Sequence, residues 1–229
     1  MTTRQIKPKP DTAEFIQFAE APPEEMTAFD YVNFPGYPAA LAEHFGNPES
    51  TIIISEIAAA LIPTRGYEGV RYPDLLIAFG VNPEARIARK GYLIPEQGKP
   101  PDFVLEVASD TTGRIDETAK REAYAAMGVP EYWRFDPSGG LWHQAPMAGD
   151  RLIEGSYVPI DISQTDDQHL WGHSESLGLA LCWEEGSLRF WDPVSRRYLT
   201  TYAEERIARH QAEARVRQLE EELHRQQNS

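Results

Sequence analysis

The sequence predicts a mixed α/β (α+β) fold with a central β-sheet flanked by helices, and three observations support this prediction. Short runs rich in β-branched residues alternate with segments rich in strong helix formers. In the first 140 residues, the predicted elements follow the order helix, three strands, helix and strand, which is typical of helices packed on a sheet. After residue 140, short apolar and aromatic runs alternate with turn residues, and these predict an antiparallel β-extension of the same sheet.

The chain begins with a proline-rich segment. Residues 1–37 hold five prolines and are predicted to form an irregular arm, with a short helical piece near residues 11–20. Residues 38–46 are typical of a helix, because Pro38 lies in the first turn and Gly46 lies just after the end.

Three strands follow in the sequence. Residues 50–56, 72–81 and 101–109 are rich in β-branched and aromatic residues. The segment 57–63 fits a strand and a helix equally well. Residues 82–100 hold several glycines and prolines, which predict a long loop.

The second half of the chain starts with a helix. Residues 114–127 are strong helix formers, and Gly128 suits the position after the helix end. Residues 130–137 are typical of a strand that ends in a turn. The antiparallel β-extension is expected over residues 141–200, and residues 202–229 predict one helix without proline or glycine.

The predicted domain organisation is an arm (1–37), one domain (38–200) and a helical tail (201–229). In the tail, four apolar residues are spaced by four, three and four positions, as in a coiled-coil seam. They are Ala212, Val216, Leu219 and Leu223. The pattern is compatible with a self-associating helix and equally with a solvated helical tail.

Composition and charge narrow the function classes. The net charge of −14 disfavours broad non-specific affinity for nucleic acid, although a local basic groove or bound cations can offset it. The single cysteine, Cys182, excludes a disulfide framework within one chain and favours a reducing compartment. The longest apolar stretch is far shorter than the ~20 residues that cross a membrane, and the first residues lack a secretory apolar run. We therefore expect a cytoplasmic protein with no membrane partner.

Two acidic residues occur in otherwise apolar strands. Glu106 lies in a strand that is apolar on both faces, where an ionised carboxylate is costly unless it is paired, hydrogen-bonded or bound to a metal. Asp74 lies at the start of the preceding strand and suits either a turn or a ligand. If the two strands are neighbours, the carboxylates converge, and a cation such as Mg²⁺ would relieve their repulsion. The carbonyl of Val107 is a further candidate ligand.

The helix 114–127 carries a third candidate. Asp116, Lys120 and Tyr124 recur every four residues and therefore share one face. The chain has five lysines against seventeen arginines, and Lys120 is the only lysine after residue 99. The alternative is an exposed Asp116–Lys120 ion pair on a solvated helix face.

Three ordered segments carry a resemblance to a known family. "YPDLLIAFG", "PPDFVLEVASDTT" and "DETAKREAYAAMGVPEYWRFDP" resemble the Uma-type restriction endonuclease domain family, part of the PD-(D/E)XK nuclease superfamily. The resemblance runs from about residue 38 to about residue 190. It implies a restriction-endonuclease-like core, a mixed sheet flanked by helices.

The resemblance also implies a site. Asp74 and Glu106 would be the metal-binding acids, with Glu56 as a possible additional acid. The usual superfamily lysine would stand two residues after Glu106, where this chain has Ala108. The resemblance implies that the lysine comes from the following helix instead, which would be Lys120.

The implied function is a metal-dependent endonuclease that uses Mg²⁺ (or Mn²⁺) to hydrolyse DNA phosphodiester bonds. Lys120 would orient the attacking water or neutralise charge on the phosphoryl oxygens, and Tyr124 would anchor the phosphate or simply pack. The alternative is an inactive nuclease-fold protein used as a binding or scaffold module, which the net charge and Ala108 favour. A homodimer is expected, since two active sites suit the cutting of two strands.

Overall fold

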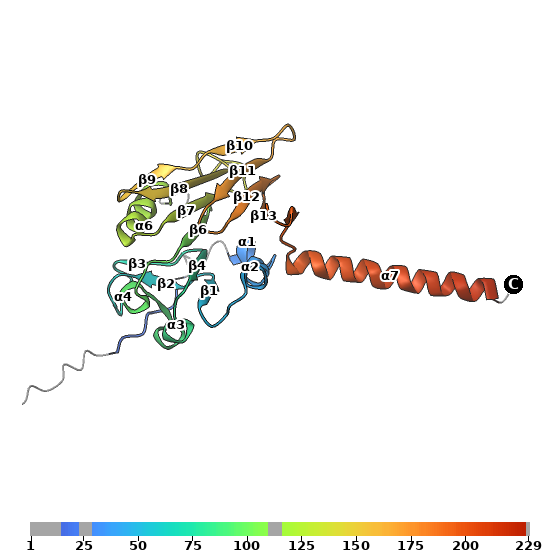
Figure 1. Cartoon of the computed structure of the whole chain (residues 1–229), viewed down its shortest axis with the longest axis horizontal. Coiled ribbons are helices and arrows are strands. Elements are labelled where there is room, and N and C mark those ends of the chain that lie inside the picture. The colour runs from blue at the N-terminus through green and yellow to red at the C-terminus, as the bar shows by residue number, and fades with distance from the viewer. Residues whose placement is uncertain (1–14, 23–28, 110–115, 228–229) are drawn as a thin grey trace, which may run out of the picture.

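The computed structural model describes residues 15–22, 29–109 and 116–227. Within these residues, the largest sheet has six strands in the order β1-β4-β6-β7-β8-β9 (Figure 1). Strand β6 runs parallel to β7, and the other neighbouring pairs are antiparallel. The predicted mixed central sheet is therefore confirmed. Its strands are β1 (Thr51–Ile54), β4 (Leu75–Phe79), β6 (Phe103–Val107), β7 (Glu131–Phe135), β8 (Met147–Ile153) and β9 (Ser156–Pro159).

A second, antiparallel sheet packs on the first. It contains β10 (Ile162–Gln164), β11 (Leu170–Ser174), β12 (Leu179–Glu184), β13 (Ser187–Asp192) and β14 (Arg197–Tyr198). Phe103 and Trp133 of the first sheet share one apolar core with Leu181 and Phe190 of the second. The prediction of a single extended sheet is thus correct for β8 and β9 but wrong for β10–β14. Buried residues alternate along β13, so these strands cover a face of the first sheet instead of lengthening it.

A third, small sheet occupies part of the region between residues 57 and 93. Its strands are β2 (Ala58–Ala60), β3 (Val70–Arg71) and β5 (Gly91–Leu93). The ambiguous segment 57–63 therefore contains a strand, and its three alanines are buried.

The predicted loop over residues 82–100 is wrong, because this region contains regular elements. They are α3 (Pro83–Arg89), β5 and α4 (Ile94–Gln97). The side chain of Asn82 accepts a hydrogen bond from the backbone N–H of Ala85, and Pro83 occupies the first helical turn. Gly91 is required for packing, since a Cβ there would lie 2.2 Å from the ring of Phe18.

The N-terminal region packs against the sheets. Residues 15–22 are irregular and not helical, and the rest of the helical piece expected near residues 11–20 lies outside the described residues. Phe18 is nevertheless buried among residues of β2 and β5. Two helices follow, α1 (Phe29–Val32) and α2 (Tyr37–Phe45), and Val32 and Leu41 enter the core shared by the two larger sheets. The second helix confirms the prediction for residues 38–46.

The opposite face of the main sheet is covered by a helical segment together with the small sheet and α4. A π-helical turn, η2 (Asp116–Lys120), leads into α6 (Arg121–Met127), which ends at Gly128 with φ +81°. The helix predicted over 114–127 is thus present from residue 116, and residues 114 and 115 lie outside the described residues. Tyr124 and Met127 pack on this face with Leu76 and Val104. The segment that carries Lys120 therefore lies over β4 and β6.

The chain ends in a long helix, as predicted. Helix α7 (Tyr202–Gln227) projects away from the sheets as a single helix (Figure 1). Val216 and Leu219 of the apolar seam are about half exposed. Among the described residues, we find no helix that is both long and apolar enough to cross a membrane.

Candidate active site

The strand register places polar side chains in one row across the main sheet. Leu75 of β4 pairs with Leu105 of β6, so the next position places Asp74 opposite Glu106. On the other side of β6, Glu106 pairs with Arg134 of β7. Opposite residues of neighbouring strands project to the same face. Asp74, Glu106 and Arg134 therefore share the face that α6 covers.

The central members of this site are buried. The exposed fraction is 4% for Asp74, 1% for Glu106 and 7% for Lys120. Ionised side chains are seldom buried to this extent unless they are paired, because desolvation costs several kcal/mol for each ion. The contacts of these residues therefore decide what the site can do.

Glu106 is held by two side chains from the helical segment. Lys120 Nζ lies 2.9 Å from Glu106 Oε2, and the Tyr124 hydroxyl donates to Glu106 Oε1 at 2.5 Å. The alternative of an exposed lysine on a solvated helix face is therefore wrong. The side chain of Asp116 lies outside the described residues. Lys120 is the last residue of the π-helical turn, a distortion that often marks functional sites.

Tyr124 interacts with both acids, Glu106 and Asp74. Burial raises the pKa of Tyr124 well above its ordinary value, and the negative charges of Glu106 and, to a smaller extent, Asp74 raise it further. The hydroxyl therefore stays protonated and acts as a hydrogen-bond donor. The hydroxyl of Tyr124 holds Glu106 by a hydrogen bond, and the negative charge of Asp74 acts on the same hydroxyl.

Asp74 is fixed against the strand that carries Glu106. Its Oδ2 accepts a hydrogen bond of 2.6 Å from the backbone N–H of Val107. Since Val107 follows Glu106 directly, this bond holds the two carboxyl groups at the same end of β6. Val107, whose N–H binds Asp74, also carries the backbone carbonyl that we predicted as a further metal ligand.

Glu56 does not form a metal-binding group with this pair in the described part of the chain. Its backbone is left-handed, with φ +53°, and its N–H donates to the carbonyl of Pro73 at 2.9 Å. Its side chain lines a pocket of about 400 Å³ together with Arg86. Burial raises the pKa of Glu56. Among the described residues, no three His, Cys, Asp or Glu side chains form a group that could hold a metal ion, so Glu56 does not complete a cluster with Asp74 and Glu106.

The donor set of Asp74 and Glu106 fits a hard divalent cation. Mg²⁺ is commonly held by one or two carboxylates together with water and substrate phosphate oxygens. A carboxylate has about four lone-pair directions, so the bonds from Lys120 and Tyr124 are compatible with a metal on the same group. The chemistry of these residues thus suits Mg²⁺ or Mn²⁺.

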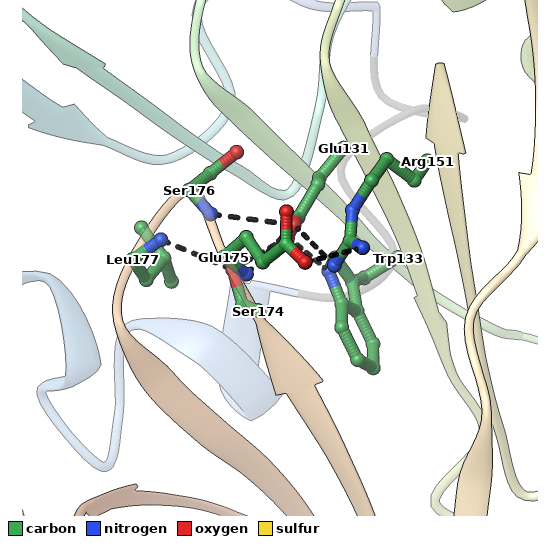
Figure 2. A network of polar contacts seen from close by, with 7 residues as sticks. All are labelled: Glu131, Trp133, Arg151, Ser174, Glu175, Ser176 and Leu177. Atoms are coloured by element: carbon green, nitrogen blue, oxygen red, sulfur yellow. Dashed lines mark hydrogen bonds and ion pairs between the residues drawn. The ribbon is translucent and has the colours of Figure 1, made fainter. Parts of the chain in front are cut away.

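A second buried carboxylate, Glu131, has a different environment (Figure 2). It is the first residue of β7 and is 1% exposed. Its oxygens accept hydrogen bonds from Trp133, Arg151, Ser174, Glu175 and Ser176. Ser174 belongs to β11, so Glu131 joins the two larger sheets. We interpret this network as structural.

Arg134 and its neighbour in space, Arg121, were not predicted from the sequence. Both contact Asp150, which is buried in β8. The signal available was a charged residue inside the aromatic strand 130–137. The pairing of that strand with the one that holds Glu106 is a long-range property, and no local pattern indicates it.

The mixed sheet and its flanking helices define the class as an α+β fold, which is the architecture that the resemblance implied. The model of the family "Uma2: Putative restriction endonuclease" matches residues 41–181, more than half of the chain. The chain belongs to this family, and the resemblance carried by the sequence motifs is confirmed.

The chain is also similar to a solved structure. The crystal structure of "a putative nuclease belonging to DUF820" from Anabaena variabilis ATCC 29413 is similar at 13% sequence identity, with a TM-score of 0.36. The match covers 55% of this chain and 63% of that chain, which is less than two thirds of its length. No curated protein matches the sequence.

Proposed function

We propose that this protein is a metal-dependent endonuclease that hydrolyses DNA phosphodiester bonds. One observation carries the proposal: Asp74 and Glu106 share one sheet face, where Lys120 forms a buried ion pair with Glu106. Membership of a restriction endonuclease family supports the reaction class. Buried, interacting titratable groups of this kind are frequent in active sites.

Each residue has a distinct role in the proposed site. Asp74 and Glu106 would hold Mg²⁺ or Mn²⁺, with the carbonyl of Val107 as a further ligand. The bound ion would polarise the scissile phosphate and lower the pKa of the attacking water. Lys120 keeps Glu106 in place and supplies positive charge where negative charge develops on the phosphoryl oxygens. Tyr124 is a positioning residue, since its hydroxyl donates to Glu106.

The lysine from the helix can replace the usual strand lysine. Ala108 lies two residues after Glu106 and therefore projects to the same face, where it is buried. Lys120 reaches this face from the covering helical segment. A small residue at position 108 is consistent with a lysine that enters from the helix instead of the strand.

The net charge of −14 and the protruding helix α7 favour the alternative, an inactive scaffold with a nuclease fold. The expected homodimer and the cytoplasmic location stay predictions. The two functions differ in one measurable property, which is cleavage of DNA by the Asp74–Glu106 site.

The test is nicking of supercoiled plasmid in the presence of Mg²⁺ or Mn²⁺. The wild-type protein should convert the plasmid to the open circular form, and Glu106→Gln should abolish the conversion. Glu213→Gln, on the exposed surface of α7, is a matched control that removes a carboxylate of the same kind and should nick normally. A wild-type protein that is inactive with both metals, or an active Glu106→Gln variant, would contradict the proposal.

A further inference from the structure

A polar cleft continues the row of side chains beyond Glu106. Arg134 lies opposite Glu106 on β7, and Ala148 lies opposite Arg134 on β8. At this end of the row, a cleft of about 450 Å³ is lined by Arg121, Arg134, Ala148 and side chains that include Thr118, His143 and Gln144. Ala148 is small, and its size leaves room over the sheet.

Two arginines in this cleft share one acid. Asp150, 1% exposed, accepts hydrogen bonds from Arg121 Nε and Nη2 at 3.1 and 2.9 Å and from Arg134 Nη2 at 2.7 Å. Arg121 Nη2 also donates to the carbonyl of Tyr157 at 2.8 Å. Two guanidinium groups against one carboxylate leave this cluster with a net positive charge.

The cluster holds the arginines in place without using all of their donors. Asp150 accepts from a single nitrogen of Arg134, whose guanidinium has five N–H groups. In the described part of the chain, the buried Arg134 Nε makes no hydrogen bond. The side chain of Arg134 is 15% exposed, so the group is largely desolvated but reaches the cleft. An arginine that is positioned in this way is suited to bind an anion from the cleft side.

The cleft adjoins the candidate metal site. Neighbouring strands lie about 4.8 Å apart, so Arg134 is one strand away from Glu106 on the same face. Arg121 follows Lys120 directly in the sequence. A strand of DNA whose scissile phosphate lies at Asp74 and Glu106 would place a neighbouring phosphate near this cleft.

We propose that the cleft between η2–α6 and β7–β8 is a DNA-backbone subsite, in which Arg121 and Arg134 bind the phosphate next to the scissile one. This inference rests on the proposed nuclease function. It also accounts for how a chain with a net charge of −14 can bind a polyanion, because a local positive cleft beside the site offsets the overall repulsion.

The test measures binding of a short fluorescein-labelled DNA duplex by fluorescence anisotropy, with Ca²⁺ in place of Mg²⁺ to limit cleavage. Arg134→Gln should weaken binding about tenfold, as expected for one charged hydrogen bond, and lower the dependence of log K on log salt by about one. Arg197→Gln, an exposed arginine of β14, is the matched control and should bind like the wild type.

A second variant separates loss of binding from loss of folding. Gln144 is exposed at the cleft, and Gln144→Glu adds a negative charge without removing any member of the Asp150 cluster. This variant should unfold at the wild-type temperature and still bind DNA several-fold more weakly. Wild-type affinity in both Arg134→Gln and Gln144→Glu would overturn the subsite.

The same variants separate this inference from the proposed function. Glu106→Gln should keep its DNA affinity while losing nicking. If Glu106→Gln nicks like the wild type but Arg134→Gln loses affinity, the proposed catalytic site fails and the subsite stands. If Glu106→Gln is inactive but the cleft variants bind and nick normally, the subsite alone fails.

Discussion

Two buried glutamates on adjacent parallel strands have different kinds of partner. Glu131 on β7 accepts hydrogen bonds from five residues, among them two backbone N–H groups and a serine of the second sheet (Figure 2). Glu106 on β6 is bonded to a lysine and a tyrosine from one helical segment, and it lies opposite the carboxyl group of Asp74. Burial alone therefore does not separate a structural acid from a functional one.

The two glutamates differ in how the free-energy cost of burying their charge is compensated. Four neutral donors and the guanidinium of Arg151 compensate the desolvation of Glu131, and the result is a rigid link between the two sheets. Glu106 beside Asp74 places two negative charges in one small space, which is unfavourable unless a cation neutralises them. Lys120 supplies one positive charge, and the proposed metal would supply the rest. Proteins commonly retain such unfavourable arrangements where function requires them.

The largest expected effect is on stability and concerns Glu131. Glu131→Ala should lower the free energy of unfolding by about 3–5 kcal/mol, because buried donors of Trp133 and Ser174 lose their acceptor and Arg151 loses its buried partner. Glu106→Gln should cost less, about 1 kcal/mol, because the amide keeps the size of the side chain and its oxygen can still accept a hydrogen bond. Urea unfolding followed by circular dichroism measures both values. Equal costs would mean that the two glutamates are of the same structural kind.

The next effect concerns catalysis by the lysine partner of Glu106. Lys120→Met should reduce nicking about 100-fold, the loss typical for removal of one group that stabilises transition-state charge. Lys90→Met, at an exposed lysine after α3, is the matched control and should retain activity.

A rescue sharpens the same prediction. Ala108→Lys in the Lys120→Met background places a lysine at the usual superfamily position, on the same face as Glu106. We expect this double variant to nick about tenfold faster than Lys120→Met if a lysine at position 108 can stabilise the same developing negative charge on the phosphate. Full activity of the single Lys120→Met variant would show that the lysine only fills space.

A third, smaller effect distinguishes the two glutamates by cation binding. Mg²⁺ at about ten times its dissociation constant should stabilise the wild-type protein by about 1.4 kcal/mol. The shift in unfolding temperature should vanish in Asp74→Asn and Glu106→Gln, but it should persist in Glu131→Gln whatever the starting stability of that variant. Loss of the shift in Glu131→Gln alone would place the cation elsewhere.

Local patterns in the sequence predicted most of the main sheet. β-Branched runs, Pro38, Gly46 and Gly128 locate strands and helix ends because these features act over a few neighbouring residues. The prediction of a loop over residues 82–100 is wrong because the glycines and prolines there lie at the ends of helices and strands. The second sheet is not predicted because antiparallel strands have the same sequence pattern whether they extend a sheet or cover one of its faces.

The site was predictable for a different reason. Glu106 and Asp74 stand out because an acid in an apolar strand is costly, and Lys120 stands out because it is a rare residue type in this chain. Arg134 and the cleft depend on the register of β6 against β7, which is determined by distant residues. Glu56 has a left-handed backbone and its side chain lines a separate pocket with Arg86. Neither property has a local sequence signal.

The smallest effect concerns Glu56, the additional acid that the resemblance suggested. Its pKa is raised by burial, so the folded state favours the protonated form, and ionisation as the pH rises opposes folding. Glu56→Gln should therefore be neutral at low pH and stabilising by about a few tenths of a kcal/mol above the raised pKa, where solvent screening keeps the effect small. Thermal unfolding at several pH values measures this difference. Nicking should stay near the wild-type level, because Glu56 lies in its own pocket with Arg86; a loss comparable to that of Glu106→Gln would instead make Glu56 a third member of the site.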